Sequence, residues 1–339
     1  METRHADGLS RREFLSGLTL AGTAGLLADR AQSAAAEPPP ETPKLRLGQT
    51  TAICQAPLYV AQEFLPAEGF NDVQYVKVGR ELLTKVVASR EVDFAFNFAG
   101  PLLIPVDAGE PIVILAGGHV GCFELFGTGR VRAIRDLRGK TVAVSELGGP
   151  DHVFLASMVA YVGLDPQKDI RWDPHPFVES TRLLAEQKVD AVLAFPPQPQ
   201  ELRDKKIGHV VVNSMMDRPW SQYFCCMVYA HPEFVRTHPV ATKRAVRAIL
   251  KGADLCAREP ERAARLLVDK GFTNSHDYAL RTMKDVAYGK WRESDPEDTL
   301  RFYALRLHEA GMVKASPKKL IAQGTDWRFL NELKKELKG

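Results

Sequence analysis

Cysteine and histidine are the residues of this chain best suited to nucleophilic or metal chemistry. The sequence holds nine histidines and five cysteines, namely Cys54, Cys122, Cys225, Cys226 and Cys256. An odd number of cysteines does not indicate a disulfide framework. The sequence has no C-x-x-C pair and no two histidines one helical turn apart, which are the spacings typical of zinc ligands. These spacings therefore give no support for a metal site, and we also expect no cofactor and no catalytic residue.

A second group of residues could bind a ligand, because its members follow predicted strands. In α/β sheets ligands bind beyond the carboxyl ends of the strands. Arg80 in such a place could hold a carboxylate through two parallel hydrogen bonds, and Phe195 could either stack on a planar ligand or cap the local core. We expect a ligand site among these residues: Thr51, Gln55, Arg80, Asn97, Phe98, Ser145, Glu146, Gly148, Gly149 and Phe195.

The elements that must position these residues alternate between strand and helix patterns. The predicted strands are 44–48, 73–78, 92–97, 112–116, 141–144, 170–174 and 190–194. The helix patterns between them are 56–64, 81–89, 101–107, 151–162 and 179–187, and from residue 239 onward the patterns are helical only. Two such α/β sets predict two lobes, each a mostly parallel sheet flanked by helices, with a C-terminal helical tail.

The N-terminal segment has the pattern of an export signal. Arg11 and Arg12 precede an apolar run over residues 15–28, which is shorter than the roughly 20 residues that span a bilayer. Ala34 and Ala36 then fit an A-x-A cleavage site. The segment Ser-Arg-Arg-Glu-Phe-Leu resembles a twin-arginine signal. We predict a twin-arginine export signal over residues 1–36, a proline-rich leader over 37–43, and a periplasmic mature protein.

The bulk composition excludes several other classes of protein. Of 339 residues, 45% are hydrophobic and 26% are charged, as in an ordinary soluble domain. The net charge is only +3 and no basic run is interleaved with aromatic residues, so we expect no nucleic-acid partner. No apolar stretch after residue 28 reaches membrane-spanning length.

Several short motifs, in this order, resemble periplasmic solute-binding proteins of ABC importers. The similarity is to the group that binds nitrate, sulfonates, taurine and the thiamine pyrimidine precursor, and it covers roughly residues 44–260. The motifs are Leu45–Gly48, Pro57–Ala61, Val92–Phe96, Asp136–Val144, Lys188–Ala191 and His231–Val235. The resemblance implies a type II clamshell that closes on a small solute in the cleft. It also implies a membrane permease with its ATPase as the partner, and we expect a monomer.

The resemblance also implies lobe boundaries and further site residues. Residues 44–127 and 228–339 would form lobe 1 and residues 128–227 lobe 2, with crossings near Gly121–Gly127 and Cys225–Tyr229. His119, Trp220 and Tyr223 would then lie near the cleft. In the anion-binding members a helix N-terminus of lobe 2 holds the ligand, and the matching stretch here begins at Ser145.

The charges and rings of this rim favour an organic ligand. Glu146 and Asp151 place negative charge beside the helix N-terminus, whereas aromatic walls can add to the binding of a planar ring. We therefore predict a ring-bearing ligand, pyrimidine-like or an aromatic acid, over nitrate, taurine or a short sulfonate.

Two alternative functions are considered. Phe224–Tyr229 resembles the cysteine-rich segment of the eukaryotic pyrimidine precursor synthase of thiamine synthesis, whose pyridoxal-phosphate lysine and histidine align with Asn97 and Pro101. Asparagine cannot form a Schiff base and proline cannot transfer a proton, so we predict no enzyme, and Cys225 and Cys226 are expected to be small buried residues. The second alternative, which the sequence does not separate from a transport role, is a subunit that presents bound ligand to a membrane partner.

Export with processing is the first testable prediction. Mass spectrometry of the periplasmic protein should give an N-terminus near Glu37, because the A-x-A site ends at Ala36. Replacing both Arg11 and Arg12 with lysine should block export while total expression stays unchanged. Unprocessed chain found only in the cytoplasm would contradict the prediction.

Overall fold

A computed structural model describes residues 37–337. The predicted export signal lies outside the described residues. Residues 37–43 contain no helix or strand, as expected for the proline-rich leader. From Pro40 onward the chain forms one compact unit, and Glu37–Pro39 are grouped with the N-terminal segment. Among the described helices, none combines the length and the apolar character needed to cross a bilayer.

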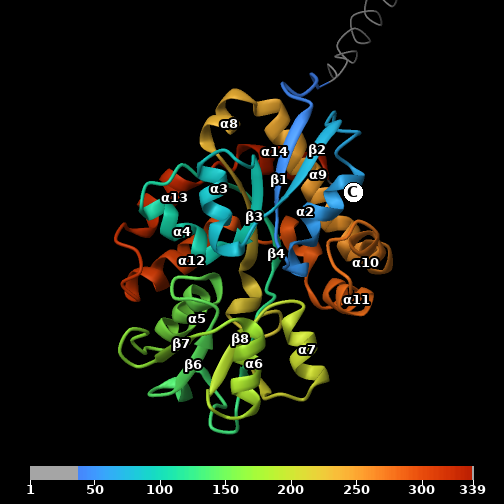
Figure 1. The fold of residues 1–339 in the computed structure, drawn as a ribbon. Coiled ribbons are helices and arrows are strands. Elements are labelled where there is room, and N and C mark those ends of the chain that lie inside the picture. Colours follow the sequence, from blue (N-terminus) through green and yellow to red (C-terminus); the bar gives the residue numbers. More distant parts are fainter. Residues whose placement is uncertain (1–36, 338–339) are drawn as a thin grey trace, which may run out of the picture. The chain divides into compact units, whose positions relative to one another are not determined.

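The strands and helices follow the alternation expected from the sequence (Figure 1). The strands are β1 (Lys44–Gln49), β2 (Asp72–Lys77), β3 (Phe94–Phe98), β4 (Val113–Val120), β5 (Glu124–Gly127), β6 (Thr141–Val144), β7 (Arg171–Pro174), β8 (Ala191–Ala194), β9 (His209–Asn213) and β10 (Phe224–Ala230). The α-helices are α2 (Ala56–Val60), α3 (Leu83–Ala88), α4 (Ala99–Asp107), α5 (Pro150–Tyr161), α6 (Phe177–Ala185), α7 (Gln198–Asp204), α8 (Pro232–Thr237), α9 (Pro239–Arg258), α10 (Pro260–Asp269), α11 (His276–Asp285), α12 (Pro296–Glu309), α13 (Pro317–Gly324) and α14 (Arg328–Glu336). Short 3-10 helices are η1 (Ile53–Gln55), η2 (Ala61–Glu63), η3 (Arg80–Leu82), η4 (Ile134–Leu137), η5 (Trp220–Gln222) and η6 (Tyr288–Arg292).

The strands form two five-stranded sheets, which define two lobes. The sheet of lobe 1 has the order β2-β1-β3-β10-β4, and that of lobe 2 has the order β7-β6-β8-β5-β9. In each sheet the strands nearest β1 or β6 pair in parallel, whereas β10 and β5 pair antiparallel with both of their neighbours. The predicted α/β class with two sheets and a helical C-terminal region is confirmed.

The exact places where the chain changes sheet differ from the expected boundaries. β5 was expected at the end of lobe 1 but pairs with β8 and β9 of lobe 2. The first residues of β10 were expected in lobe 2, yet the whole strand pairs with β3 and β4 of lobe 1. The crossings therefore run over residues 121–123 and 214–223. The hydrophobic pattern of the sequence does not show where the chain changes sheet, because β4, β5 and β10 are all buried along their full length.

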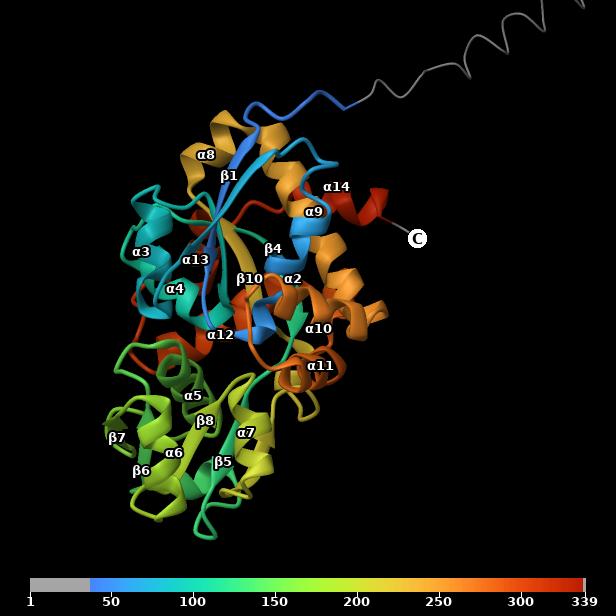
Figure 2. The same ribbon diagram turned by 45° about the vertical axis from the view of Figure 1, so that its right-hand side comes forward.

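Helices cover the sheet of lobe 1 (Figure 2). The longest of them, α9, buries an apolar stripe that recurs every three or four residues, including Ala245, Ile249 and Cys256. It approaches α2 so closely that a Cβ atom on Gly252 would lie 2.4 Å from the carbonyl oxygen of Pro57. Glycine at this position therefore allows α9 to pack directly against α2, next to the residues after β1 that were predicted to bind a ligand.

The two crossings are bound to each other by one serine. The Ser214 hydroxyl accepts the backbone N–H of Cys122 (3.1 Å) and of Phe123 (2.8 Å) and donates to the Phe123 carbonyl (2.8 Å). Gly121 makes this approach possible, because its φ is +55° and a Cβ there would lie 2.4 Å from the Ser214 carbonyl oxygen. The two connections between the lobes therefore run as one packed pair of segments.

We predict that Gly121→Ala destabilises the fold through this contact. The matched control is Gly109→Ala, since Gly109 also has a positive φ of +80°, but among the described residues only its own chain neighbours lie within 4 Å of an added Cβ. Both variants should lose about 1–2 kcal/mol from left-handed backbone strain. Overpacking should cost Gly121→Ala about 1–3 kcal/mol more. Urea unfolding would measure the difference, and equal losses in the two variants would refute the close approach.

Candidate ligand-binding site

Aromatic rings close the centre of the contact between the lobes. Phe98 at the end of β3 lies 5.6 Å from Phe195 and 4.5 Å from Phe123, measured between ring centroids. Phe195 follows β8 of lobe 2, and Phe123 belongs to the first crossing. Beside them the Ile53 N–H of lobe 1 donates to the Pro196 carbonyl of lobe 2 at 3.2 Å. The residues expected at the strand ends therefore meet, but Phe98 and Phe195 are buried against protein.

Ion pairs join α7 of lobe 2 to α11 on the opposite side. The guanidinium of Arg281 donates to both carboxylate oxygens of Asp204, at 2.8 and 2.6 Å. Arg203 donates to Asp285 at 3.1 Å and also pairs with Glu124. Burial raises the pKa of Glu124, and the charge of Arg203 opposes that shift. The contact between the lobes is thus polar as well as aromatic.

A cavity of about 240 Å³ lies between the lobes. Lobe 1 contributes residues of η3, α3, β3 and α4, and lobe 2 contributes the loop before α5. The cavity is lined by Arg80, Thr84, Lys85, Asn97, Pro101, Ile104, Pro105, Ala108, Glu110, Glu146, Gly148, Gly149 and Pro150. Five of the predicted site residues are among them, namely Arg80, Asn97, Glu146, Gly148 and Gly149. Sequence reasoning did not single out the wall that α4 supplies.

Two of these lining residues are held in place by neighbours. The guanidinium carbon of Arg80 lies 3.7 Å from the centroid of the Phe195 ring, which places a cation on the aromatic face. Asn97 accepts the backbone N–H of Phe98 at 2.9 Å through its side-chain oxygen. Phe195 thus supports Arg80, and its covered face is not available for stacking on a ligand in this arrangement.

Side chains in the first turn of α5 satisfy the donors of the preceding loop that were expected to hold an anion. The Asp151 carboxylate accepts the Ser145 N–H at 2.6 Å and the Ser145 hydroxyl at 2.5 Å. The Gly148 N–H donates to Nδ1 of His152 at 2.9 Å. Burial lowers the pKa of His152, against the charge of Asp151, and the neutral ring can accept this bond. Ser145 therefore faces Asp151 rather than the cavity.

Two predicted residues near β1 lie apart from the cavity between the lobes. Gln55 is fully buried, where its amide donates to the Phe96 carbonyl at 2.7 Å and accepts from the Thr50 hydroxyl at 2.8 Å. Thr51 lines a different hollow of about 370 Å³ together with Lys77 and Phe272. Gln55 thus orders the loop after β1, and Thr51 faces another surface.

Trp220 and Tyr223 also do not line the cavity. Trp220 is buried with ring centroids 5.2 Å from Tyr161 of α5 and 5.6 Å from Phe302 of α12. Tyr223 stacks on Phe302 at 4.1 Å. The rings pack the second crossing against α5 and α12, so these two residues give no aromatic wall to a ligand.

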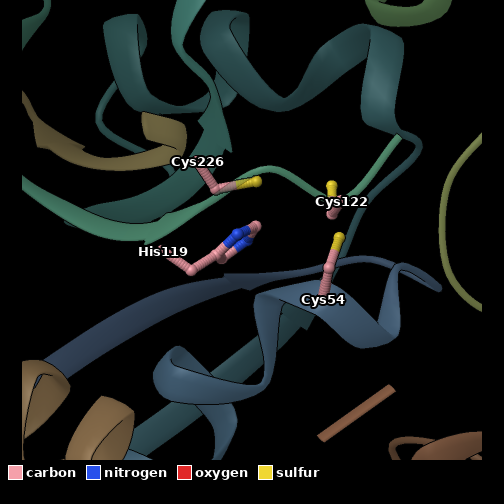
Figure 3. Close-up of side chains that lie close together, drawn as sticks. All are labelled: Cys54, His119, Cys122 and Cys226. Atoms are coloured by element: carbon pink, nitrogen blue, oxygen red, sulfur yellow. The ribbon is translucent and has the colours of Figure 1, made fainter. Parts of the chain in front are cut away.

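His119 lies in a buried cluster with three cysteines (Figure 3). Its side chain points toward those of Cys54, Cys122 and Cys226, and one donor atom from each residue lies within 4.8 Å of all the others. All four residues are fully buried. The sequence argument against a metal site missed this group, because its members come from η1, β4, the first crossing and β10 and have no regular spacing.

A family model described as NMT1/THI5 like matches residues 54–263. The chain belongs to this family. The match runs from η1 to the start of α10 and includes every strand except β1, together with both crossings.

Individual relatives agree with the fold. The chain is 23% identical over 305 residues to the nitrate/nitrite binding protein NrtA of Nostoc sp., covering 80% of this chain and 68% of the relative. The crystal structure of the periplasmic nitrate-binding protein NrtA from Synechocystis superposes with a TM-score of 0.73 at 17% identity, covering 89% and 90% of the two chains. The alkanesulfonate-binding protein SsuA from Xanthomonas axonopodis pv. citri, bound to MOPS, gives a TM-score of 0.65 at 15% identity, covering 86% and 100%.

The role of Asp151 in the loop before α5 is testable. Asp151→Ala should lower the free energy of unfolding by about 1–3 kcal/mol, because it leaves the partly buried Ser145 donors without an acceptor. Asp165→Ala is the control, since that more exposed carboxylate accepts the N–H of Gln167 at 2.9 Å in the same lobe. It should cost less than Asp151→Ala, because the contacts of an exposed carboxylate contribute little to stability. Thermal unfolding of both variants would check the order, and the reverse order would contradict it.

Proposed function

We propose that the protein is the extracytoplasmic substrate-binding component of an ABC importer and captures a small ring-bearing organic solute between its lobes. The observation that carries the proposal is the cavity between β3, α4 and the loop before α5. Family membership and the nitrate- and sulfonate-binding relatives support solute binding as the role. The predicted export signal supports a periplasmic location, and a permease with its ATPase is the corresponding partner. No catalytic role is proposed, since the named relatives are binding proteins.

The chemistry of the cavity favours an organic solute over a small inorganic anion. Its volume of about 240 Å³ is far larger than the space that a single ordered water needs. Pro101, Ile104 and Pro105 supply an apolar wall, which adds nothing for nitrate but can bury the edge or face of a ring. The donors of Ser145 and Gly148 are already bonded to Asp151 and His152.

Both signs of charge surround the cavity. Arg80 and Lys85 can bind a carboxylate, and Glu110 and Glu146 can accept from an amine or a protonated ring nitrogen. Asn97 and Pro101, which align with the lysine and histidine of the pyrimidine precursor synthase, both line this cavity. That placement supports a pyrimidine-like ligand held at the same position without the chemistry of the enzyme. An aromatic acid is the second ligand type that the lining suits.

Titration calorimetry of the mature protein tests the ligand class. Pyrimidines and aromatic carboxylates are titrated beside nitrate and taurine, and we expect the tightest binding among the ring compounds. Thr84→Trp should weaken that binding by at least 10-fold, about 1.4 kcal/mol, because the indole would fill space that the ligand needs. Thr51→Ala is the matched control and should bind as the unmodified protein does, since Thr51 lines the other hollow.

Two results would overturn the proposal at different levels. Submicromolar binding of nitrate or taurine with no response to any ring compound would reject the ligand class but keep the transport role. If Thr84→Trp bound the ring compound with unchanged affinity, or if Thr51→Ala bound it more weakly, the binding site would lie elsewhere on the protein.

A further inference from the structure

The cluster of Cys54, His119, Cys122 and Cys226 has the donor set of a closed metal site. Three thiols and one imidazole offer donor atoms within 4.8 Å of one another. In a tetrahedral zinc site, zinc–sulfur bonds of about 2.3 Å place sulfur atoms about 3.8 Å apart. The donors would therefore move together by roughly 1 Å or less. Figure 3 shows the four side chains directed toward one common space.

The hydrogen bonding of His119 leaves one ring nitrogen available as a ligand. Nδ1 lies 3.1 Å from the carbonyl oxygen of Gly121. A carbonyl oxygen can only accept, so Nδ1 carries the proton, and Nε2 of the neutral ring then has a free lone pair. Nε2 is buried without a hydrogen-bond partner among the described residues. A histidine bonded through one nitrogen to a carbonyl, with the other nitrogen free, has the arrangement that metal-binding histidines adopt.

The surroundings of the cluster suit a structural site. All four side chains are fully buried, and the rings of Phe96 and Tyr288 lie 6.0 and 5.3 Å from the ring of His119. No carboxylate belongs to the cluster, which favours a soft or borderline-soft ion over calcium or magnesium. Four protein donors leave no open position for water or substrate, so the set matches structural rather than catalytic zinc sites.

We propose that Cys54, His119, Cys122 and Cys226 bind one structural Zn²⁺ ion. The ion would join η1 and β4 to the first crossing and to β10, the strand that follows the second crossing. It would therefore fix the lobe 1 ends of both connections between the lobes. This inference does not depend on the solute proposed above, because none of the four residues lines the cavity.

Disulfide formation between Cys225 and Cys122 would compete with metal binding for the Cys122 thiol. Sγ of Cys225 lies 2.9 Å from Sγ of Cys122, and both residues are free thiols in this structure. A small disulfide such as oxidised glutathione could accept two electrons and two protons from this pair and leave as two thiols, and the Cys122–Cys225 disulfide so formed would remove one zinc ligand. Metal loading must therefore be measured on reduced protein, and Cys225→Ser separates the two reactions.

The test uses the full mature chain, reduced, stripped of metal by a chelator under mild denaturation and refolded with Zn²⁺ or Co²⁺. We expect one equivalent of metal per chain, a higher melting temperature and, with Co²⁺, the intense visible bands and thiolate charge transfer of a tetrahedral site. Cys54→Ser, Cys226→Ser and His119→Ala should each weaken binding by more than about 100-fold, since even outer-shell partners contribute about 10- to 100-fold. Affinity should fall as the pH falls, because the thiols must lose protons to bind.

Controls make each outcome decisive. Cys256→Ser removes a buried cysteine of α9 outside the cluster and should retain full binding, as should Cys225→Ser. Circular dichroism of the metal-free variants should match that of the metal-free parent protein, which separates ligand loss from misfolding. Absence of stoichiometric Zn²⁺ or Co²⁺ binding by reduced protein would overturn the proposal. Unchanged binding in the folded ligand variants, or a loss in Cys225→Ser, would overturn the ligand set.

Discussion

The double crossing of the chain between its two sheets is the constraint on which the rest of the structure depends. Each sheet has an antiparallel strand, β5 or β10, that adjoins a crossing. The crossings must lie side by side, and the Ser214 hydroxyl with its three hydrogen bonds satisfies the backbone groups of Cys122 and Phe123 that would otherwise be buried without partners. Gly121 is required there because any side chain would overlap the Ser214 backbone.

Both candidate sites take their positions from this pair of crossings. The cavity lies where the carboxyl ends of β3 and β6 face each other across the join, between α4 of one lobe and the loop before α5 of the other. The cysteine–histidine cluster lies within the join, with Cys122 in the first crossing and Cys226 near the start of β10. A movement of one lobe against the other would change the width of the cavity, because residues of both lobes line it.

Much of the fold could be predicted from the sequence, because strands and helices depend on the pattern of hydrophobic residues within each short segment. Strand and helix periodicity located β1, β6 and α5 within one residue at each end, and the strand ends suggested Arg80, Asn97 and Glu146, which the structure places in the lining of the cavity. The failures concern contacts between distant segments. The sequence shows aromatic residues at Trp220 and Tyr223, but only the position of Phe302 in α12 decides that these rings pack against protein. The assembly of Cys54 with Cys226 depends in the same way on strand order, which no spacing reveals.

The carboxylate of Asp151 acts as a built-in competitor. It is attached to the same helix whose N-terminal loop it fills, so its effective concentration at Ser145 is set by the chain and does not change with the surrounding solution. A dissolved anion that approached this loop would have to displace a tethered one and would gain only the difference between the two affinities. Under the proposed function, the loop before α5 would therefore disfavour simple anions without excluding them sterically, whereas a solute held by the other walls of the cavity would not have to displace Asp151.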